Sequence, residues 1–70
     1  MNANALRKDL EAHPEKYLKH EDWQVRAAAD WACTHLGIRN IRGLTSTPQQ
    51  GRDALAEFVR RVKEYQTKGA

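Results

Sequence analysis

The sequence predicts a small all-α domain with three main helices. Apolar residues recur every three or four positions in three stretches, helix start and stop signals frame those stretches, and no stretch alternates long enough to form a strand. No internal repeat, linker or low-complexity segment divides the 70 residues, so we expect a single helical domain over residues 1–70. A chain of this length buries only about 60% of the surface that its unfolded form exposes, so its core is small.

The stretch Asp22–Gly37, DWQVRAAADWACTHLG, predicts the central helix, at about residues 22–36. Asp22 is suited to cap its N-terminus, and Gly37 is suited to supply the left-handed residue that ends it. At about 100° per residue, the apolar side chains cover an arc wide enough to touch more than one neighbour. These apolar residues are Val25, Ala28, Ala29, Trp31, Ala32, Cys33 and Leu36. Trp31 borders the arc, and we expect it to belong to the core.

Residues 2–12 predict a short N-terminal amphipathic helix, with Leu6 and Leu10 on one face and an Arg7–Glu11 pair available on the other. We expect this helix to end before Pro14, because the α conformation is disfavoured for a residue that precedes proline.

Pro14 suits the first position of a new turn. We expect an extra helical turn at 14–20, carrying Tyr17 and Leu18 inward. Whether this turn merges with the central helix is left open by the sequence.

The least regular stretch follows Gly37, and three apolar residues, Ile38, Ile41 and Leu44, are expected to pin it as a loop. Thr47-Pro48-Gln49-Gln50 then combines a threonine N-cap, a proline at the first helical position and a glutamine able to complete a capping box. A C-terminal helix at about 48–67 is therefore predicted. Its apolar stripe, expected to pack on the central helix, comprises Leu55, Phe58, Val59, Val62 and Tyr65.

Charge distribution and cysteine content indicate the cellular compartment and the kinds of partner to expect. The excess positive charge resides in residues 38–70, which carry seven basic and three acidic side chains, while residues 1–37 carry five basic and six acidic ones, giving +3 overall. No stretch has the pattern of a secretion signal or membrane span. Cys33 is the only cysteine, which excludes an internal disulfide. We expect a buried structural thiol and a cytoplasmic location.

Catalytic and metal-binding patterns are not found in the sequence. His13, His20 and His35 fall in three different segments, and none stands at a telling spacing from a nucleophile. Neither paired Cys-x-x-Cys motifs nor a glycine-rich phosphate loop occurs. We therefore expect a protein that is not an enzyme, with no catalytic residues, metal, cofactor or small-molecule substrate.

The segment 32–38, ACTHLGI, resembles the first helix and turn of a helix-turn-helix, in which hydrophobic residues flank a glycine preceded four positions earlier by a small residue. The following stretch departs from that pattern, because Gly43 and Ser46 stand where a recognition helix buries apolar residues. Leu36-Gly37-Ile38 is equally typical of an ordinary helix C-cap.

A basic stripe supports a DNA-binding hypothesis without that motif. Arg52, Arg60 and Lys63 lie along one flank of the C-terminal helix, and Arg39 and Arg42 are placed to extend the stripe from the loop. Phosphate binding by such residues is salt-sensitive and largely independent of sequence. The alternative function is therefore a small basic DNA-binding regulator, with a solvated face as the simpler interpretation.

Trp23 is predicted to face away from the arc of the central helix. It either packs under the N-terminal helix, against Leu6 and Leu10, or is exposed and forms with Tyr17 a hot spot for a protein partner. The leading hypothesis is a cytoplasmic helical module that acts by protein–protein interaction, as an adaptor or inhibitor, with self-association as a homodimer expected. Its candidate partner-binding residues are Trp23, Tyr17, Ile41 and Leu44.

Overall fold

Four helices account for most of the chain in the computed structural model, which describes residues 2–39, 42–43 and 45–68. The helices are α1 (Ala3–Ala12), α2 (Pro14–Leu18), α3 (Trp23–His35) and α4 (Pro48–Lys68). The described residues contain no strand, and the prediction of a small all-α domain with three longer helices is confirmed.

The two longest helices start at the predicted caps. The Asp22 carboxylate accepts hydrogen bonds from the backbone N–H groups of Gln24, at 2.8 Å, and Val25, at 3.4 Å. At the start of α4, the Gln50 N–H donates to the Thr47 hydroxyl at 3.1 Å, and the Thr47 N–H donates to the Gln50 side chain at 2.9 Å. The capping box is thereby confirmed.

Gly37 ends the α3 segment as predicted. Its φ of +74° is the left-handed conformation that glycine adopts without steric cost. The chain then turns back, and the Arg39 N–H donates to the Cys33 carbonyl at 2.9 Å. Ile38 packs partly buried against the core. The chain therefore leaves α3 in a fixed direction.

α2 is a separate helix and does not merge with α3. Pro14 occupies its N-terminus, and three local hydrogen bonds hold the connection to α3. The Asp22 N–H donates to Nδ1 of His20 at 3.0 Å, and the Arg26 guanidinium donates to the backbone carbonyls of His20 and Glu21 at 2.6 and 3.2 Å.

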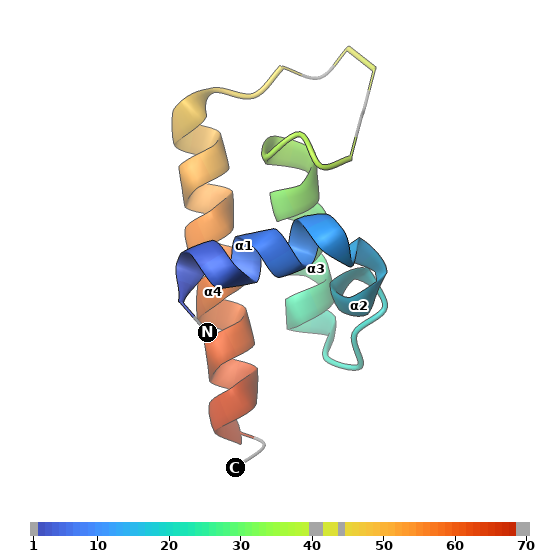
Figure 1. Cartoon of the computed structure of the whole chain (residues 1–70), viewed down its shortest axis with the longest axis vertical. Helices are drawn as coiled ribbons and strands as arrows, with labels where there is room; N and C mark the ends of the chain where they lie inside the picture. The colour runs from blue at the N-terminus through green and yellow to red at the C-terminus, as the bar shows by residue number, and fades with distance from the viewer. Residues whose placement is uncertain (1, 40–41, 44, 69–70) are drawn as a thin grey trace.

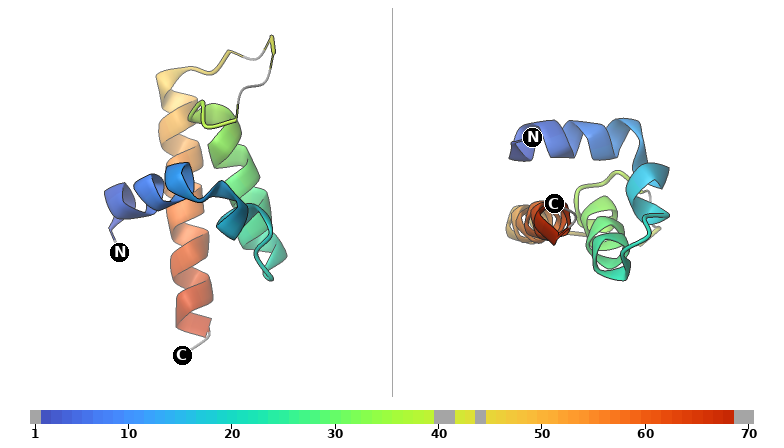
Figure 2. Two further views of the ribbon diagram at one scale, coloured as in Figure 1. Left: turned by 45° about the vertical axis from the view of Figure 1, so that its right-hand side comes forward. Right: turned by 90° about the horizontal axis from the view of Figure 1, so that it is seen from below.

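The helices form a crossed arrangement. α3 and α4 lie side by side and run in opposite directions, α1 crosses both, and α2 lies beside α3 (Figure 1). The end-on view in Figure 2 shows α1 stretched over one side of the α3–α4 pair, while no helix covers the opposite side. This asymmetry decides which faces of α3 and α4 are exposed.

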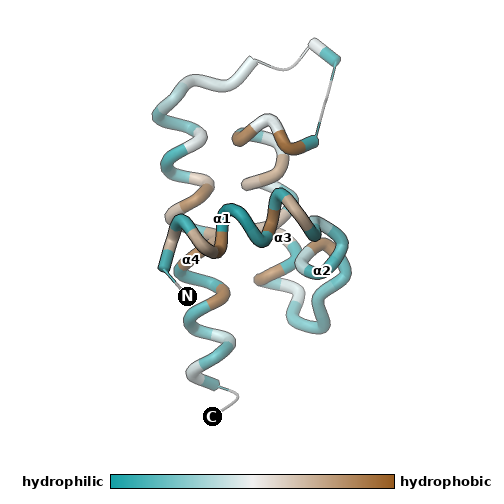
Figure 3. The backbone as a smooth tube through the Cα atoms, in the orientation of Figure 1, coloured by the Kyte–Doolittle hydropathy of each residue, from teal (hydrophilic) through white to brown (hydrophobic). Residues whose placement is uncertain are grey.

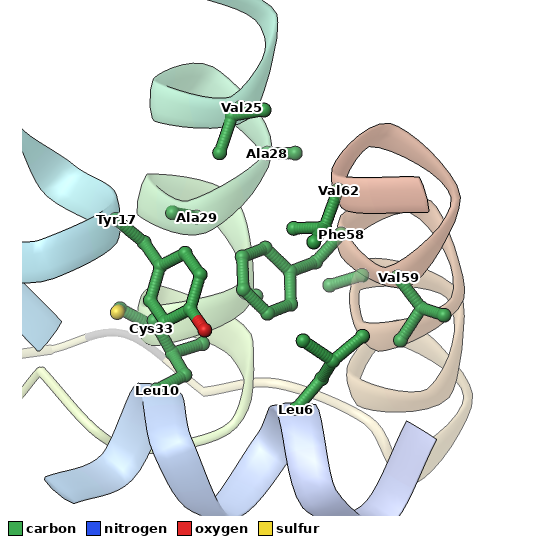
Figure 4. Close-up of a cluster of buried hydrophobic side chains, with 12 residues drawn as sticks. Leu6, Leu10, Tyr17, Val25, Ala28, Ala29, Cys33, Phe58, Val59 and Val62 are labelled. Atoms are coloured by element: carbon green, nitrogen blue, oxygen red, sulfur yellow. The ribbon is translucent and has the colours of Figure 1, made fainter. Parts of the chain in front are cut away.

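All four helices contribute to one core (Figure 4). Its buried members are Leu6, Leu10, Tyr17, Val25, Ala28, Ala29, Ala32, Cys33, Ala54, Phe58, Val59 and Val62. The Tyr17 and Phe58 rings meet edge to face at 5.0 Å between centroids. The predicted packing of the C-terminal stripe on the central helix is confirmed.

The close approach of α4 to the end of α3 depends on Gly51. A Cβ atom at this position would lie 3.3 Å from the His35 carbonyl oxygen and 3.5 Å from a Leu36 methyl group. Beyond the core, the last turns of α4 are mostly hydrophilic (Figure 3). Among the residues that the structure describes, no helix has both the length and the apolar composition needed to cross a membrane.

Candidate functional site

Trp23 and Trp31 are the large exposed hydrophobic side chains of the described chain, at 66% and 51% exposure. The expectation that Trp31 belongs to the core is therefore wrong, as is the alternative that Trp23 packs under Leu6 and Leu10. Trp31 follows Ala29, which is fully buried, by two residues, so it lies about 160° away around the helix. α1 inserts its leucines on the other side of α3, in the core with Phe58.

Three exposed residues of α3, Trp23, Ala27 and Trp31, stand four positions apart and form one line along the helix. We call these three residues the tryptophan face. Beside this line is a shallow groove of about 140 Å³ between α3 and α4. The residues lining the groove are Trp23, Gln24, Ala27, Ala28, Trp31, Glu57 and Arg61.

The far rim of the groove is formed by charged side chains of α4 held in fixed geometry. Arg61 donates to the Glu57 carboxylate at 2.8 Å and to the side-chain oxygen of Gln24 at 2.9 Å, which links α4 to α3. Hydrogen bonds from Arg60, and then from Arg61, hold the pKa of the Glu57 carboxyl below its usual value. The rim therefore carries an ionised, paired carboxylate and guanidinium beside two indole rings.

Tyr17 does not join this surface. Its side chain is only 5% exposed, and its hydroxyl donates a hydrogen bond to the Asp9 carboxylate, which also pairs with Lys16 at 2.8 Å. Burial, followed by the bond to Asp9, raises the pKa of the Tyr17 hydroxyl. The expectation that the Tyr17 side chain points inward is confirmed. The hypothesis that Tyr17 is an exposed contact residue beside Trp23 is wrong, because Tyr17 belongs to the core.

The two remaining partner-binding candidates, Ile41 and Leu44, lie outside the described residues. Between His35 and Pro48, the residues that are described form turns, bends and irregular backbone rather than helix. The likeness to a helix-turn-helix therefore extends no further than the end of α3 and its turn in this part of the chain.

Three basic residues of α4 share one groove. Arg52, Arg60 and Lys63 line a groove of about 520 Å³ together with apolar residues. These apolar residues are Ala3, Leu55, Ala56 and Val59. Arg60 is also paired with Glu57 at 3.1 Å and with Glu64 at 3.7 Å. Three of the five predicted phosphate-binding residues are thus brought together.

The two loop arginines are placed elsewhere. Arg39 pairs with Asp30 of α3, at 2.5 Å, and Arg42 lies exposed in a turn. Neither is among the residues lining the α4 groove. The expectation that they extend the stripe therefore has no support in the observed contacts.

Cys33, His20 and His35, three residues with side chains capable of catalysis, make structural contacts. Cys33 is 1% exposed, and burial raises the pKa of its thiol, which disfavours the thiolate that a nucleophile needs. The His20 ring stacks edge to face on Tyr65 at 4.5 Å, and His35 Nδ1 lies 2.8 Å from the Ser46 hydroxyl. Within the described part of the chain, no three histidine, cysteine or acidic side chains gather as a metal-binding group.

Sequence reasoning missed Trp31 as a surface residue, although a suitable indication was present. The four-residue spacing of Trp23, Ala27 and Trp31 places them on one face of the helix, whose centre at Ala27 lies about 160° from the buried Val25 and about 140° from the buried Ala32. The apolar arc of the central helix is wider than a small core can cover, which indicates that part of the arc is exposed.

The fold and surface together define a small all-α domain with an exposed tryptophan face. Comparison with known proteins finds no matching family model, no significantly similar curated protein and no significantly similar solved structure. A function must therefore be argued from the geometry of this surface.

Proposed function

We propose that this protein is a non-enzymatic protein-interaction module of the adaptor or inhibitor type, and that the tryptophan face is its binding surface. The observation that carries the proposal is the exposure of Trp23 and Trp31 on one helical line, 66% and 51% exposed. Tryptophan is the residue type most enriched among interface hot spots, and neighbouring exposed apolar side chains mark interaction sites.

The energetic scale of this surface suits an interface. A tryptophan side chain buries 150–250 Å² at most, so covering two half-exposed indoles removes on the order of 250 Å² of apolar surface from water. This corresponds to about 6 kcal/mol of gross stabilisation before the costs of association are subtracted. A partner that covers both rings therefore gains enough to offset a large part of those costs.

The surroundings of the face resemble the anatomy of known interfaces. An apolar centre is bordered by a polar rim in which Glu57, Arg61 and Gln24 already satisfy one another. Because these side chains are held by mutual hydrogen bonds, a partner meets a surface with little rotamer freedom left to lose. A cytoplasmic setting belongs to the proposal, since the single thiol is buried and unpaired.

The proposal is tested with the double variant Trp23→Ala/Trp31→Ala and with Lys63→Ala, an exposed control on α4. Both variants should keep the helical circular-dichroism signal of the wild type, because none of these side chains is buried. Affinity capture with identification of the bound protein, together with light scattering, should detect a partner or an oligomer for the wild type and for Lys63→Ala only. If the double variant retains the same partner or oligomer, the tryptophan face is not the binding surface.

DNA binding is the second candidate function, favoured by the position of Arg52, Arg60 and Lys63 around one groove. Fluorescence anisotropy with a labelled duplex should then show binding at about 50 mM salt that weakens steeply by about 200 mM. Replacing Arg52 and Lys63 with glutamine should weaken binding and reduce the salt dependence. Absence of binding at the lower salt concentration would exclude this function.

A further inference from the structure

We infer that the tryptophan face binds a second copy of this chain, with the two α3 helices antiparallel across a two-fold axis at Ala27. The inference rests on the proposed function, because it names the occupant of the same surface. Three features of α3 and its neighbours support it: the symmetric spacing of the tryptophans, the arrangement of charges beside them, and the open side of the helix pair.

The spacing of the face is symmetric about its centre. In a two-fold interface, residue i of one copy contacts residue j of the other, and j contacts i. Trp23 and Trp31 stand four residues on either side of Ala27. An antiparallel arrangement centred on Ala27 therefore brings Trp23 of each copy opposite Trp31 of the other, so that all four indoles are covered by one operation.

Side-chain size fits this register. Ala27 is the small residue at the centre, where two helices must approach most closely, while the bulky indoles lie about 6 Å along the axis to either side. The groove of about 140 Å³ between Trp23, Trp31 and the α4 rim is then available to part of an indole from the second copy. Each copy therefore offers both a protruding indole and a groove to receive one, as a self-complementary surface requires.

Charges beside the face also favour the antiparallel register. Arg26 and Asp30 are exposed, one turn apart, on the side of the tryptophan line that faces away from α4. In an antiparallel pair, the same flank of both helices meets, so Arg26 of each copy lies near Asp30 of the other and two equivalent ion pairs form. In a parallel pair, opposite flanks of the two helices meet, so Arg26 and Asp30 of one copy do not face Asp30 and Arg26 of the other.

The existing contacts of these two side chains leave room for the new pairs. The Arg26 guanidinium has five N–H donors, of which Nη1 supplies those bonded to the carbonyls of His20 and Glu21. The Asp30 carboxylate pairs with Arg39 through Oδ1. Among the described residues, no contact to Oδ2 is observed, so a further partner can be added there without breaking the contacts seen in this part of the chain.

The open side of the helix pair gives the second copy access. α1 crosses the opposite side of the α3–α4 pair, and α2 lies beside α3 (Figure 2). Among the described residues, those lining the groove come from α3 and α4. A domain of this size gains stability by self-association, which covers the apolar surface that its own helices leave exposed.

Disulfide trapping tests the register. Ala27→Cys should form a covalent dimer rapidly under mild oxidation, because the two-fold axis brings the two Cβ atoms together. Ala56→Cys, at an exposed alanine of α4, is the matched control and should form it slowly. The native Cys33 is buried and does not interfere. Equal cross-linking rates for the two variants would overturn the inference.

A charge exchange provides a second test without cysteine chemistry. Arg26→Asp and Asp30→Arg should each lower the dimer fraction severalfold in sedimentation or light scattering, and the combined exchange should restore most of it. Failure of the combined exchange to restore association, while each single change weakens it, would contradict the antiparallel pairing.

These outcomes separate the inference from the proposed function. If the wild type remains monomeric at all concentrations while an identified different protein binds through Trp23 and Trp31, the second copy is excluded and the interaction function stands. If the protein is monomeric and binds no protein through these residues, both fail.

Discussion

The ring of Tyr17 lies edge to face on the ring of Phe58, with centroids 5.0 Å apart and planes at 85°. This contact joins α2 to α4, which are separated in the chain by α3 and the segment that follows it. The Tyr17 hydroxyl adds a hydrogen bond to Asp9 of α1. A helix of only five residues is thereby held against two longer ones.

Replacing Tyr17 should therefore destabilise the fold. Tyr17→Ala removes a buried aromatic ring and should lower the free energy of unfolding by about 3–5 kcal/mol. Tyr17→Phe keeps the ring but removes the hydroxyl and should cost about 1 kcal/mol. Urea denaturation followed by circular dichroism measures both values, and Trp23→Ala, at an exposed position, should change stability by less than about 0.5 kcal/mol in the monomer. A Tyr17→Ala protein as stable as the wild type would contradict a core role.

Acid should weaken the fold partly through Asp9. Hydrogen bonds from Lys16, and then from Tyr17, hold the pKa of this carboxyl below its ordinary value of 3.8 in the folded chain. Because the unfolded chain takes up the proton first, the stabilisation is complete above that value and is lost as the pH falls through the lower folded pKa. Asp9→Asn should therefore show a shallower fall of unfolding free energy with acid than the wild type, measured by urea denaturation at a series of pH values. Glu11→Gln, an exposed carboxylate of the same helix, serves as the control, and equal slopes for Asp9→Asn and the wild type would refute the assignment.

Gly37 should resist substitution because of its left-handed backbone. Gly37→Ala places a Cβ at φ +74° and should cost about 1–2 kcal/mol, although no neighbouring atom lies within 4 Å of that Cβ. Gly37→Asn should cost less, because asparagine tolerates this conformation better. Thermal or urea unfolding of the two variants measures the order, and a fully neutral alanine would show that the turn relaxes.

The features that sequence alone predicts here are local ones. The caps at Asp22, Thr47 and Gly37 each depend on a few neighbouring residues, and the start of α4 follows from Thr47-Pro48 without any knowledge of the rest of the fold. The apolar stripe of α4 was equally predictable, because a single strong period of three to four residues specifies one buried face. Such features do not depend on how the helices cross.

The exposed face was not predictable in the same way. A helical wheel shows which residues of α3 lie on one side, but it does not show which side α1 covers. In the structure, the leucines of α1 pack in the same core as Val25 and Ala29. Sequence alone favours a core position for Trp31, because a large apolar residue on a broad arc is more often buried than exposed. The local pattern indicates that part of the broad apolar arc is exposed, but which part depends on where α1 packs, and α1 lies outside α3 and its neighbouring turns.

The charged residues show the same division. The Glu57–Arg61 pair was predictable from its four-residue spacing and is present at 2.8 Å. The pairing of Arg39 with Asp30 depends instead on the path of the chain after Gly37. A loop arginine placed by such a turn cannot be added to a distant stripe on the basis of charge alone.

The burial of Cys33 gives this small protein a natural reporter of its own opening. The only thiol of the chain lies in the core cluster of Figure 4, so an alkylating reagent reaches it only when the helices separate. When closing is faster than alkylation, the labelling rate measures the fraction of molecules that are open at any moment. A ligand, or a second copy of the chain, that binds only the closed form lowers the open fraction and therefore slows the labelling of Cys33. Binding can thus be detected without attaching a probe.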